Sequence, residues 1–173
     1  MTTDSNETMP LIAGKVGDEL PDFSLEAYCP QSGLYCEVDT RQLQAAGKWC
    51  VLFFYPADFS TLCPTELADL MEVSEVLEEL DCAVIAISSD SKHTHLAWAT
   101  QEPLLKDITF PLASDIQGRV ASSLGVLDEK TGLPLRATLL VNPNGILLDK
   151  EVSFFNIGRN SRETMRKVEA YIY

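Results

Sequence analysis

Between residues 50 and 80, the hydrophobic residues form first an unbroken run and then a helical repeat. Residues 51–55 are all apolar, aromatic or β-branched, which is typical of a strand buried on both faces. Pro56 ends this run, and from Pro64 onward apolar residues recur at helical spacings between acidic ones. The apolar positions are Leu67, Leu70, Met71, Leu77 and Leu80, and the acidic ones are Glu66, Asp69, Glu72, Glu75, Glu78 and Glu79. The pattern predicts a buried strand followed by an amphipathic helix with proline in its first turn.

The rest of the chain predicts further strands and helices around this unit. A second buried strand at residues 82–88 makes a parallel βαβ unit with a right-handed crossover. Before this unit, we expect a hairpin at 26–40 around Gly33 and a brief turn or helix at 42–47. After it, we expect a helix at 89–101, a short strand at 109–112 and a helix at 115–124 capped by Asp115. The chain is then expected to form a hairpin of 136–141 and 146–154 with a turn at 142–145, and a helix at 160–173 with Asn160 and Glu163 as a capping box. Residues 1–14 show no periodicity and are expected to be a mobile lead-in, and residues 15–173 a single domain.

Composition narrows the classes of function. A formal charge of −13 argues against binding to nucleic acid or to anionic membrane surfaces. No apolar run approaches the roughly 18 residues of a membrane span, and the polar start lacks the features of a signal peptide, so a cytoplasmic protein is expected. His93 and His95 are two residues apart and would point to different helix faces, so we expect no metal site between them. We also expect no cofactor. Five cysteines without a CxxC pair indicate neither a disulfide framework nor a zinc site, which leaves redox-active thiols.

Cys63 lies where the expected strand passes into the expected helix. Unpaired N–H groups and the helix dipole at a helix N-terminus favour the thiolate, which is the nucleophilic form of cysteine. The alternative is a small, buried and inert thiol, as many cysteines are. The neighbouring residues favour the nucleophile: Pro56 stands seven residues before Cys63, Ser60 three before it, and Pro64-Thr65-Glu66 follow directly.

The segment FFYPADFSTLCPTE resembles the active-site segment of peroxiredoxins of the alkyl hydroperoxide reductase C and thiol-specific antioxidant group. The likeness extends from about residue 15 to residue 173, and includes KVGDELPDFSL at 15–25 and HLAW at 95–98. It implies an α/β protein with a thioredoxin-like fold and peroxiredoxin additions, namely an N-terminal hairpin and an extra helix. A central mixed sheet would be flanked by helices.

The resemblance also implies a function and residue roles. The protein would be a thiol-dependent peroxidase that reduces hydrogen peroxide and alkyl hydroperoxides through a sulfenic acid on Cys63, with an antioxidant role in cell redox homeostasis. Ser60 would hydrogen-bond the peroxide, Arg136 would stabilise the thiolate and orient the peroxide, and Pro56 would shield the sulfur from water. Glu66 and Arg159 would form a supporting ion pair. The partners implied are a hydroperoxide, a thiol reductant and a second copy in a homodimer, or a ring of such dimers.

Regeneration of Cys63 is where the sequence departs from the family pattern. Typical two-cysteine members carry a resolving cysteine in a Val-Cys-Pro segment after the last helix, whereas this sequence stops at Tyr173. Cys50 and Cys82 are expected to be structural, which leaves Cys29 and Cys36 as candidate resolving thiols. The other candidates are an external thiol, such as a thioredoxin, a glutaredoxin or a small thiol, and a tail lost by truncation.

Two other functions compete with the peroxidase. A thiol–disulfide oxidoreductase would need a second cysteine three residues after Cys63, where Glu66 stands. A peroxide-sensing redox switch or holdase would use oxidation of Cys63 as its signal.

Overall fold

The computed structural model describes residues 14–173, so the expected lead-in lies outside the described residues except for Gly14. The strands are β1 (Ser24–Cys29), β2 (Leu34–Asp39), β3 (Trp49–Phe54), β4 (Cys82–Ser88), β5 (Leu112–Ser114), β6 (Leu127–Asp128), β7 (Leu133–Pro134), β8 (Arg136–Val141) and β9 (Leu147–Ser153). The helices are α1 (Thr40–Ala45), α2 (Cys63–Glu79), α3 (Lys92–Gln101), α4 (Arg119–Ser123) and α5 (Ser161–Ile172), with a 3₁₀ turn η1 (Pro103–Leu105).

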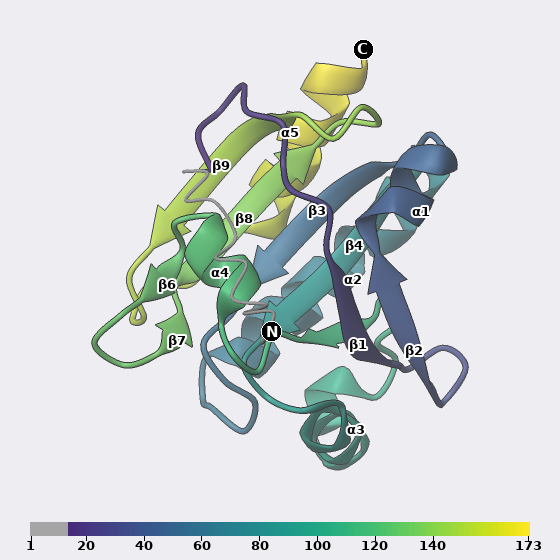
Figure 1. Ribbon diagram of the computed structural model, residues 1–173. Helices are drawn as coiled ribbons and strands as arrows, with labels where there is room; N and C mark the ends of the chain where they lie inside the picture. The colour runs from purple at the N-terminus through teal and green to yellow at the C-terminus, as the bar shows by residue number, and fades with distance from the viewer. Residues whose placement is uncertain (1–13) are drawn as a thin grey trace, which may run out of the picture.

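Seven strands form one mixed sheet in the order β2-β1-β5-β4-β3-β8-β9, and β6 and β7 form a separate ribbon (Figure 1). Strands β3, β4 and β5 run parallel to one another, and the outer strands on both sides are antiparallel to their neighbours. Strand β3 pairs in parallel with β4 from Trp49↔Cys82 to Phe54↔Ile87, and α2 connects the two strands. The predicted βαβ unit is therefore confirmed.

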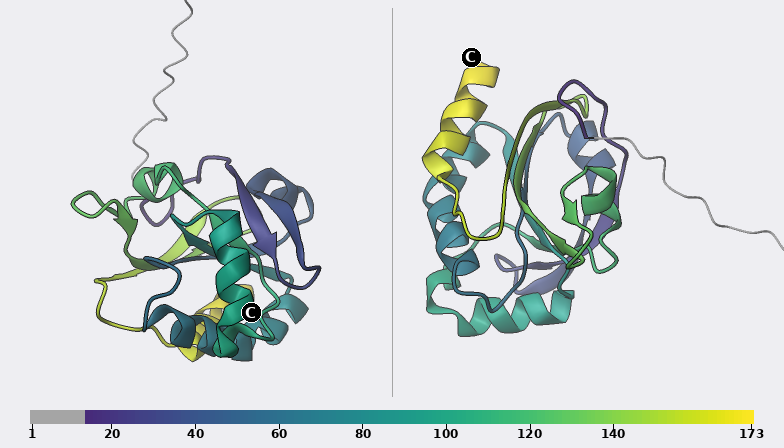
Figure 2. Two further views of the ribbon diagram at one scale, coloured as in Figure 1. Left: turned by 90° about the horizontal axis from the view of Figure 1, so that it is seen from below. Right: turned by 90° about the vertical axis from the view of Figure 1, so that its left-hand side faces the viewer.

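The sheet separates two apolar cores, because successive side chains of a strand point to opposite faces. Phe53 packs in the core under α2 and α5, whereas its neighbour Phe54 packs in the core under α1 and α4. Figure 2 shows α2 and α5 on one side of the sheet and α1 and α4 on the other. The thioredoxin-like prediction of a central mixed sheet flanked by helices is confirmed.

Two elements, a strand and a helix, differ most from the sequence prediction. The strand expected at 109–112 lies at Leu112–Ser114, because Pro111 has no N–H for a ladder and only its carbonyl accepts, from Ala86 N–H at 3.1 Å. The helix expected at 115–124 is shortened to Arg119–Ser123. Residues 115–118 instead form a turn, in which Gly118 takes a left-handed conformation (φ 65°) and Asp115 accepts from the N–H groups of Val120 and Ala121.

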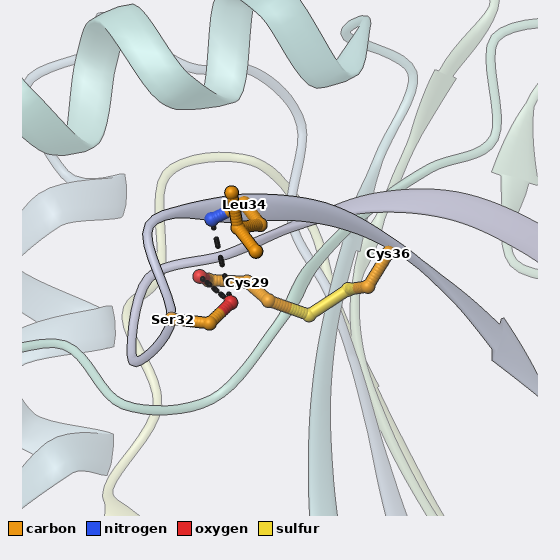
Figure 3. Close-up of a disulfide and its surroundings, with 4 residues drawn as sticks. All are labelled: Cys29, Ser32, Leu34 and Cys36. Carbon is orange, nitrogen blue, oxygen red and sulfur yellow. Dashed lines mark hydrogen bonds between the residues drawn. A yellow bond between two sulfur atoms is a disulfide. The ribbon is translucent and has the colours of Figure 1, made fainter.

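A disulfide joins Cys29 to Cys36 across the first hairpin (Figure 3). The expectation that the cysteines indicate no disulfides was therefore wrong for this pair. Cysteine count and CxxC spacing carry no information on which residues a hairpin brings face to face. Cys29 pairs with Leu34 and Cys36 with Ala27 in the ladder, so the two cysteines are diagonal neighbours with Cα atoms 6.0 Å apart, a normal separation for a disulfide.

Within residues 14–173, no helix is both long and apolar enough to cross a membrane.

The packing of α2 on the sheet gives a testable stability difference between adjacent residues. Leu77 is fully buried, while Val76 is 38% exposed. We expect Leu77→Ala to lower the free energy of unfolding by about 2–5 kcal/mol, because it leaves a cavity in the core. Val76→Ala, the matched control, should change it by about 0.5 kcal/mol or less. Urea unfolding of the two variants measures both values, and equal effects would contradict the described packing of α2.

Candidate active site

Cys63 is the first residue of α2, and its side chain is fully buried. Strand β3 ends at Phe54, and residues 55–62 form the loop that leads from the strand to the helix. Pro64 occupies the first turn, where a missing N–H leaves no helical bond unmade. The Cys63 N–H donates to Oγ of Ser60 at 3.3 Å. The cysteine therefore lies at the N-terminus of a 17-residue helix, as predicted, and Ser60 is in direct contact with its backbone.

Arg136 brings a positive charge to the sulfur. It opens β8, which pairs with β3 through Phe54↔Ala137, so Arg136 lies beside the end of the strand that leads to Cys63. Its Nη1 donates to Sγ of Cys63 at 3.3 Å, and its Nε donates to the carbonyl of Phe155 at 2.7 Å. Only 3% of Arg136 is exposed. Arg136 therefore places a buried positive charge in hydrogen-bond contact with the sulfur of Cys63.

Glu66 holds two arginines in place. One carboxylate oxygen accepts from Nη1 of Arg136 and from Nη2 of Arg159, and the other accepts from Nε of Arg159 at 2.9 Å and from its backbone N–H at 2.8 Å. Arg159 also lies over the ring of Phe53, 3.5 Å from the ring centroid. Burial opposes ionisation of Glu66, but the hydrogen bonds and charge of Arg159, together with the charge of Arg136, outweigh it and hold the pKa of Glu66 below its ordinary value.

Hydrogen bonds of Asp58 to Tyr55 and His95 hold the loop before Cys63, and the sequence did not predict them. Asp58, which is buried, accepts from the Tyr55 hydroxyl at 2.7 Å, and its other oxygen lies 2.7 Å from Nδ1 of His95. Nε2 of His95 lies 3.1 Å from the carbonyl of Ala113, which can only accept, so Nε2 carries a proton. Burial raises the pKa of Asp58 above its ordinary value. The available signal in the sequence was that Asp58 is the one charged residue in the loop at 55–62.

The same loop contains a backbone conformation that is rare for a bulky side chain. Phe59 has φ 58°, in the left-handed region. Its neighbour Asp58 donates its N–H to Asp90 at 2.8 Å, and the Phe59 ring lies near Trp98, with ring centroids 6.4 Å apart. Such conformations persist where the surroundings fix them, so the Asp58 contacts hold the turn between Pro56 and Ser60.

The two histidines of α3 point to different faces, as the sequence predicted. His95 is fully buried, whereas His93 is exposed and its Nδ1 lies 2.8 Å from the hydroxyl of Tyr35.

The chain that carries this site is similar in sequence and fold to known proteins. Residues 16–150 match the model of the AhpC/TSA family. The chain belongs to this family. Alkyl hydroperoxide reductase C of Staphylococcus aureus is 34% identical over 158 residues, which are 91% of this chain and 82% of that protein. YkuU of Bacillus subtilis (strain 168) is 39% identical over 158 residues, 90% of this chain and 87% of YkuU.

Solved structures of AhpC proteins share the fold. The crystal structure of Enterococcus faecalis AhpC has a TM-score of 0.85 at 40% identity, covering 90% of this chain and 91% of the other. Mycobacterium tuberculosis AhpC has a TM-score of 0.85 at 29% identity, covering 93% and 99%. Members of the AhpC/TSA family are thiol-dependent peroxidases. The predicted family and enzyme class are confirmed.

The other four cysteines of this AhpC/TSA member lie away from Cys63. Cys50 and Cys82 are buried near the starts of β3 and β4, where burial raises the pKa of both thiols, that of Cys82 to about 12. Cys29 and Cys36 are bonded to each other, and Cys36 packs on the core opposite to that of Cys63. Four strand spacings separate β2 from β3, roughly 19 Å. The structure thus brings Ser60, Arg136 and Glu66 to Cys63, and does not bring the candidate resolving cysteines there.

The Glu66 ion pairs predict a pH-dependent loss of stability. We expect Glu66→Gln to lower the free energy of unfolding near pH 7 by about 3–5 kcal/mol, because the change leaves two buried guanidiniums without their carboxylate. Since the folded pKa of Glu66 lies below the ordinary value of 4.5, this stabilisation is present above that pH and is lost as the pH falls through the folded pKa.

Urea unfolding of the wild type and Glu66→Gln from pH 7 down to pH 3 measures the effect. The difference between the two proteins should shrink below about pH 4.5. Glu72→Gln, a change at an exposed position of the same helix, is the matched control and should change stability by about 0.5 kcal/mol or less. A difference that stays constant over this pH range would contradict the assigned ionisation of Glu66.

Proposed function

We propose that this chain reduces hydrogen peroxide and alkyl hydroperoxides through a sulfenic acid on Cys63. The observation that carries the proposal is the contact of 3.3 Å between Nη1 of Arg136 and the buried sulfur of Cys63 at the start of α2. A buried cysteine with a structural role needs no charged donor, whereas a nucleophilic thiolate does.

The residues around Cys63 fit the needs of each part of the reaction. The thiolate attacks one peroxide oxygen, an S–O bond forms as the O–O bond breaks, and the second oxygen leaves with the electron pair. This oxygen takes a proton and departs as water or an alcohol. The guanidinium of Arg136 and the hydroxyl of Ser60 are placed to donate to the oxygens, where negative charge develops. Pro56, which is buried, limits access of water to the sulfur.

The sulfenic acid is reduced by a thiol from outside the described part of the chain. This proposal rests on the placement of the other cysteines, since Cys50 and Cys82 are buried in strands and Cys29 is bonded to Cys36. One thiol of a thioredoxin, a glutaredoxin or a small thiol attacks Cys63–SOH, and a disulfide and water form. A second thiol then releases the Cys63 thiol and leaves the reductant as a disulfide.

AhpC-family proteins form dimers or larger oligomers. For this chain we propose a homodimer, or a ring of dimers, that functions in the cytoplasm. The support for the dimer is an exposed apolar strip on edge strand β9 and the segment after it. Its members Val152, Phe154 and Ile157 are 41%, 63% and 59% exposed.

The proposed function is tested by removal of the nucleophile. We expect Cys63→Ser to abolish peroxide consumption in the presence of a thiol reductant, because the hydroxyl that replaces the thiol is a far weaker nucleophile. Cys82→Ser, at a buried cysteine distant from the site, is the control and should retain turnover. Circular dichroism shows whether both variants are folded. Peroxide consumption by folded Cys63→Ser at the wild-type rate would refute the proposal.

The role of Arg136 gives a further prediction. Arg136→Lys keeps the positive charge but loses the planar fork that reaches Cys63, Glu66 and Phe155 together. We expect the second-order rate constant of the peroxide step to fall by a factor of roughly 100–1,000. Stopped-flow fluorescence measures this step, and Arg162→Lys, on the exposed side of α5, is the control. A rate constant equal to that of wild type would place Arg136 outside the reacting centre.

A further inference from the structure

The disulfide between Cys29 and Cys36 joins two strands at the edge of the sheet (Figure 3). Cys29 ends β1, and Cys36 lies in β2, the outermost strand. Both residues are half-buried, in contrast to the buried Cys50 and Cys82. The pair is therefore less shielded from thiols in solution than Cys50 and Cys82 inside β3 and β4.

The hairpin is held by interactions that do not involve the disulfide. A ladder of six residue pairs runs from Ser24↔Asp39 to Cys29↔Leu34. At the turn, Ser32 Oγ donates to the carbonyl of Cys29 at 3.2 Å and accepts from the N–H of Leu34 at 3.3 Å. Cleavage of the S–S bond would leave both sulfur atoms facing each other on a formed hairpin, ready to bond again.

Contacts with α3 hold the same hairpin on its other face. Lys92 pairs with Glu26 at 2.8 Å, and the Tyr35 hydroxyl lies 2.8 Å from Nδ1 of His93. A disulfide that closes so short a loop, with seven residues of separation, adds little entropic stabilisation compared with one that closes a long loop. The hairpin therefore has contacts that remain when the disulfide is reduced.

The pair is separate from the peroxidatic cysteine. Ala27 and Cys36 pack on one face of the sheet, and Cys29, two residues after Ala27 in β1, points to the same face. Cys63 packs on the opposite face. The sheet therefore lies between the two sites, and β2 and β3 are roughly 19 Å apart, so the folded chain holds the pair away from Cys63.

We propose that Cys29 and Cys36 form a second redox site, a dithiol–disulfide couple that exchanges with dithiols and disulfides in solution independently of Cys63. In the reducing direction, a thiolate of the reductant attacks one sulfur, the Cys29–Cys36 bond breaks and a mixed disulfide forms. A second reductant thiol then displaces the cysteine. The reductant leaves as a disulfide, and Cys29 and Cys36 gain two electrons and two protons as thiols. In the oxidising direction, a disulfide such as oxidised glutathione accepts the same two electrons.

The full chain carrying Cys63→Ser tests this proposal without interference from the peroxidase site. The protein is equilibrated in buffers of reduced and oxidised glutathione, quenched with acid and alkylated, and mass spectrometry then gives the oxidised fraction of the pair. We expect the ratio of disulfide to dithiol to change tenfold for each tenfold change in the ratio of oxidised glutathione to the square of reduced glutathione. The circular dichroism spectrum should stay unchanged throughout.

Variants of the single cysteines supply the controls. Cys29→Ser should leave Cys36 able to form only a mixed disulfide with glutathione, whereas Cys50→Ser and Cys82→Ser should titrate like the parent. A disulfide that glutathione reduces only after the protein is unfolded would overturn the proposal. The proposal would also be overturned if reduction unfolded the hairpin, or if oxidised glutathione did not restore the disulfide. Because the test lacks Cys63, its failure leaves the proposed peroxidase function intact.

Discussion

The site depends on one buried carboxylate between two buried guanidiniums. Glu66 belongs to α2, Arg136 to β8 and Arg159 to the segment before α5, so a single side chain joins three parts of the chain that are distant in sequence. Burial of these charges is unfavourable unless each is paired and hydrogen-bonded, and the bonds to Phe155, Ala137 and the Arg159 backbone meet that requirement. The arginine that faces the sulfur is therefore fixed before any peroxide arrives, so little reorganisation is needed during the reaction.

A second polar network fixes the other side of the sulfur. Asp58 joins the loop before Cys63 to Tyr55, to His95 of α3 and, through its backbone, to Asp90. The ion pairs therefore position the arginine, and the Asp58 network positions the loop that carries Pro56 and Ser60. Cys63 lies between them, at the junction of a buried strand and a long helix.

The sequence predicted the features that are encoded in adjacent residues, and it did not predict most contacts between residues that are distant along the chain. Strand β4 has the predicted bounds, and Cys63 begins the predicted helix, because an unbroken apolar run and a change to helical period are written in adjacent residues. The contacts of Arg136 and Glu66 could be expected only through the family resemblance, since no local pattern joins residues 70 positions apart. The Asp58–His95 bond and the Cys29–Cys36 disulfide both depend on tertiary placement, and neither composition nor spacing carries that information.

We infer that Glu66 acts on the reaction by holding Arg136 against Cys63. A double-mutant cycle on the peroxide step tests this role, with stopped-flow rate constants for wild type, Glu66→Gln, Arg136→Lys and the double variant, each shown by circular dichroism to be folded. We expect the double variant to react about as fast as Arg136→Lys alone, because positioning by Glu66 no longer affects the peroxide step when residue 136 lacks the fork that reaches Cys63. Rate losses that multiply, so that the double variant is slower by the product of the two single effects, would contradict it.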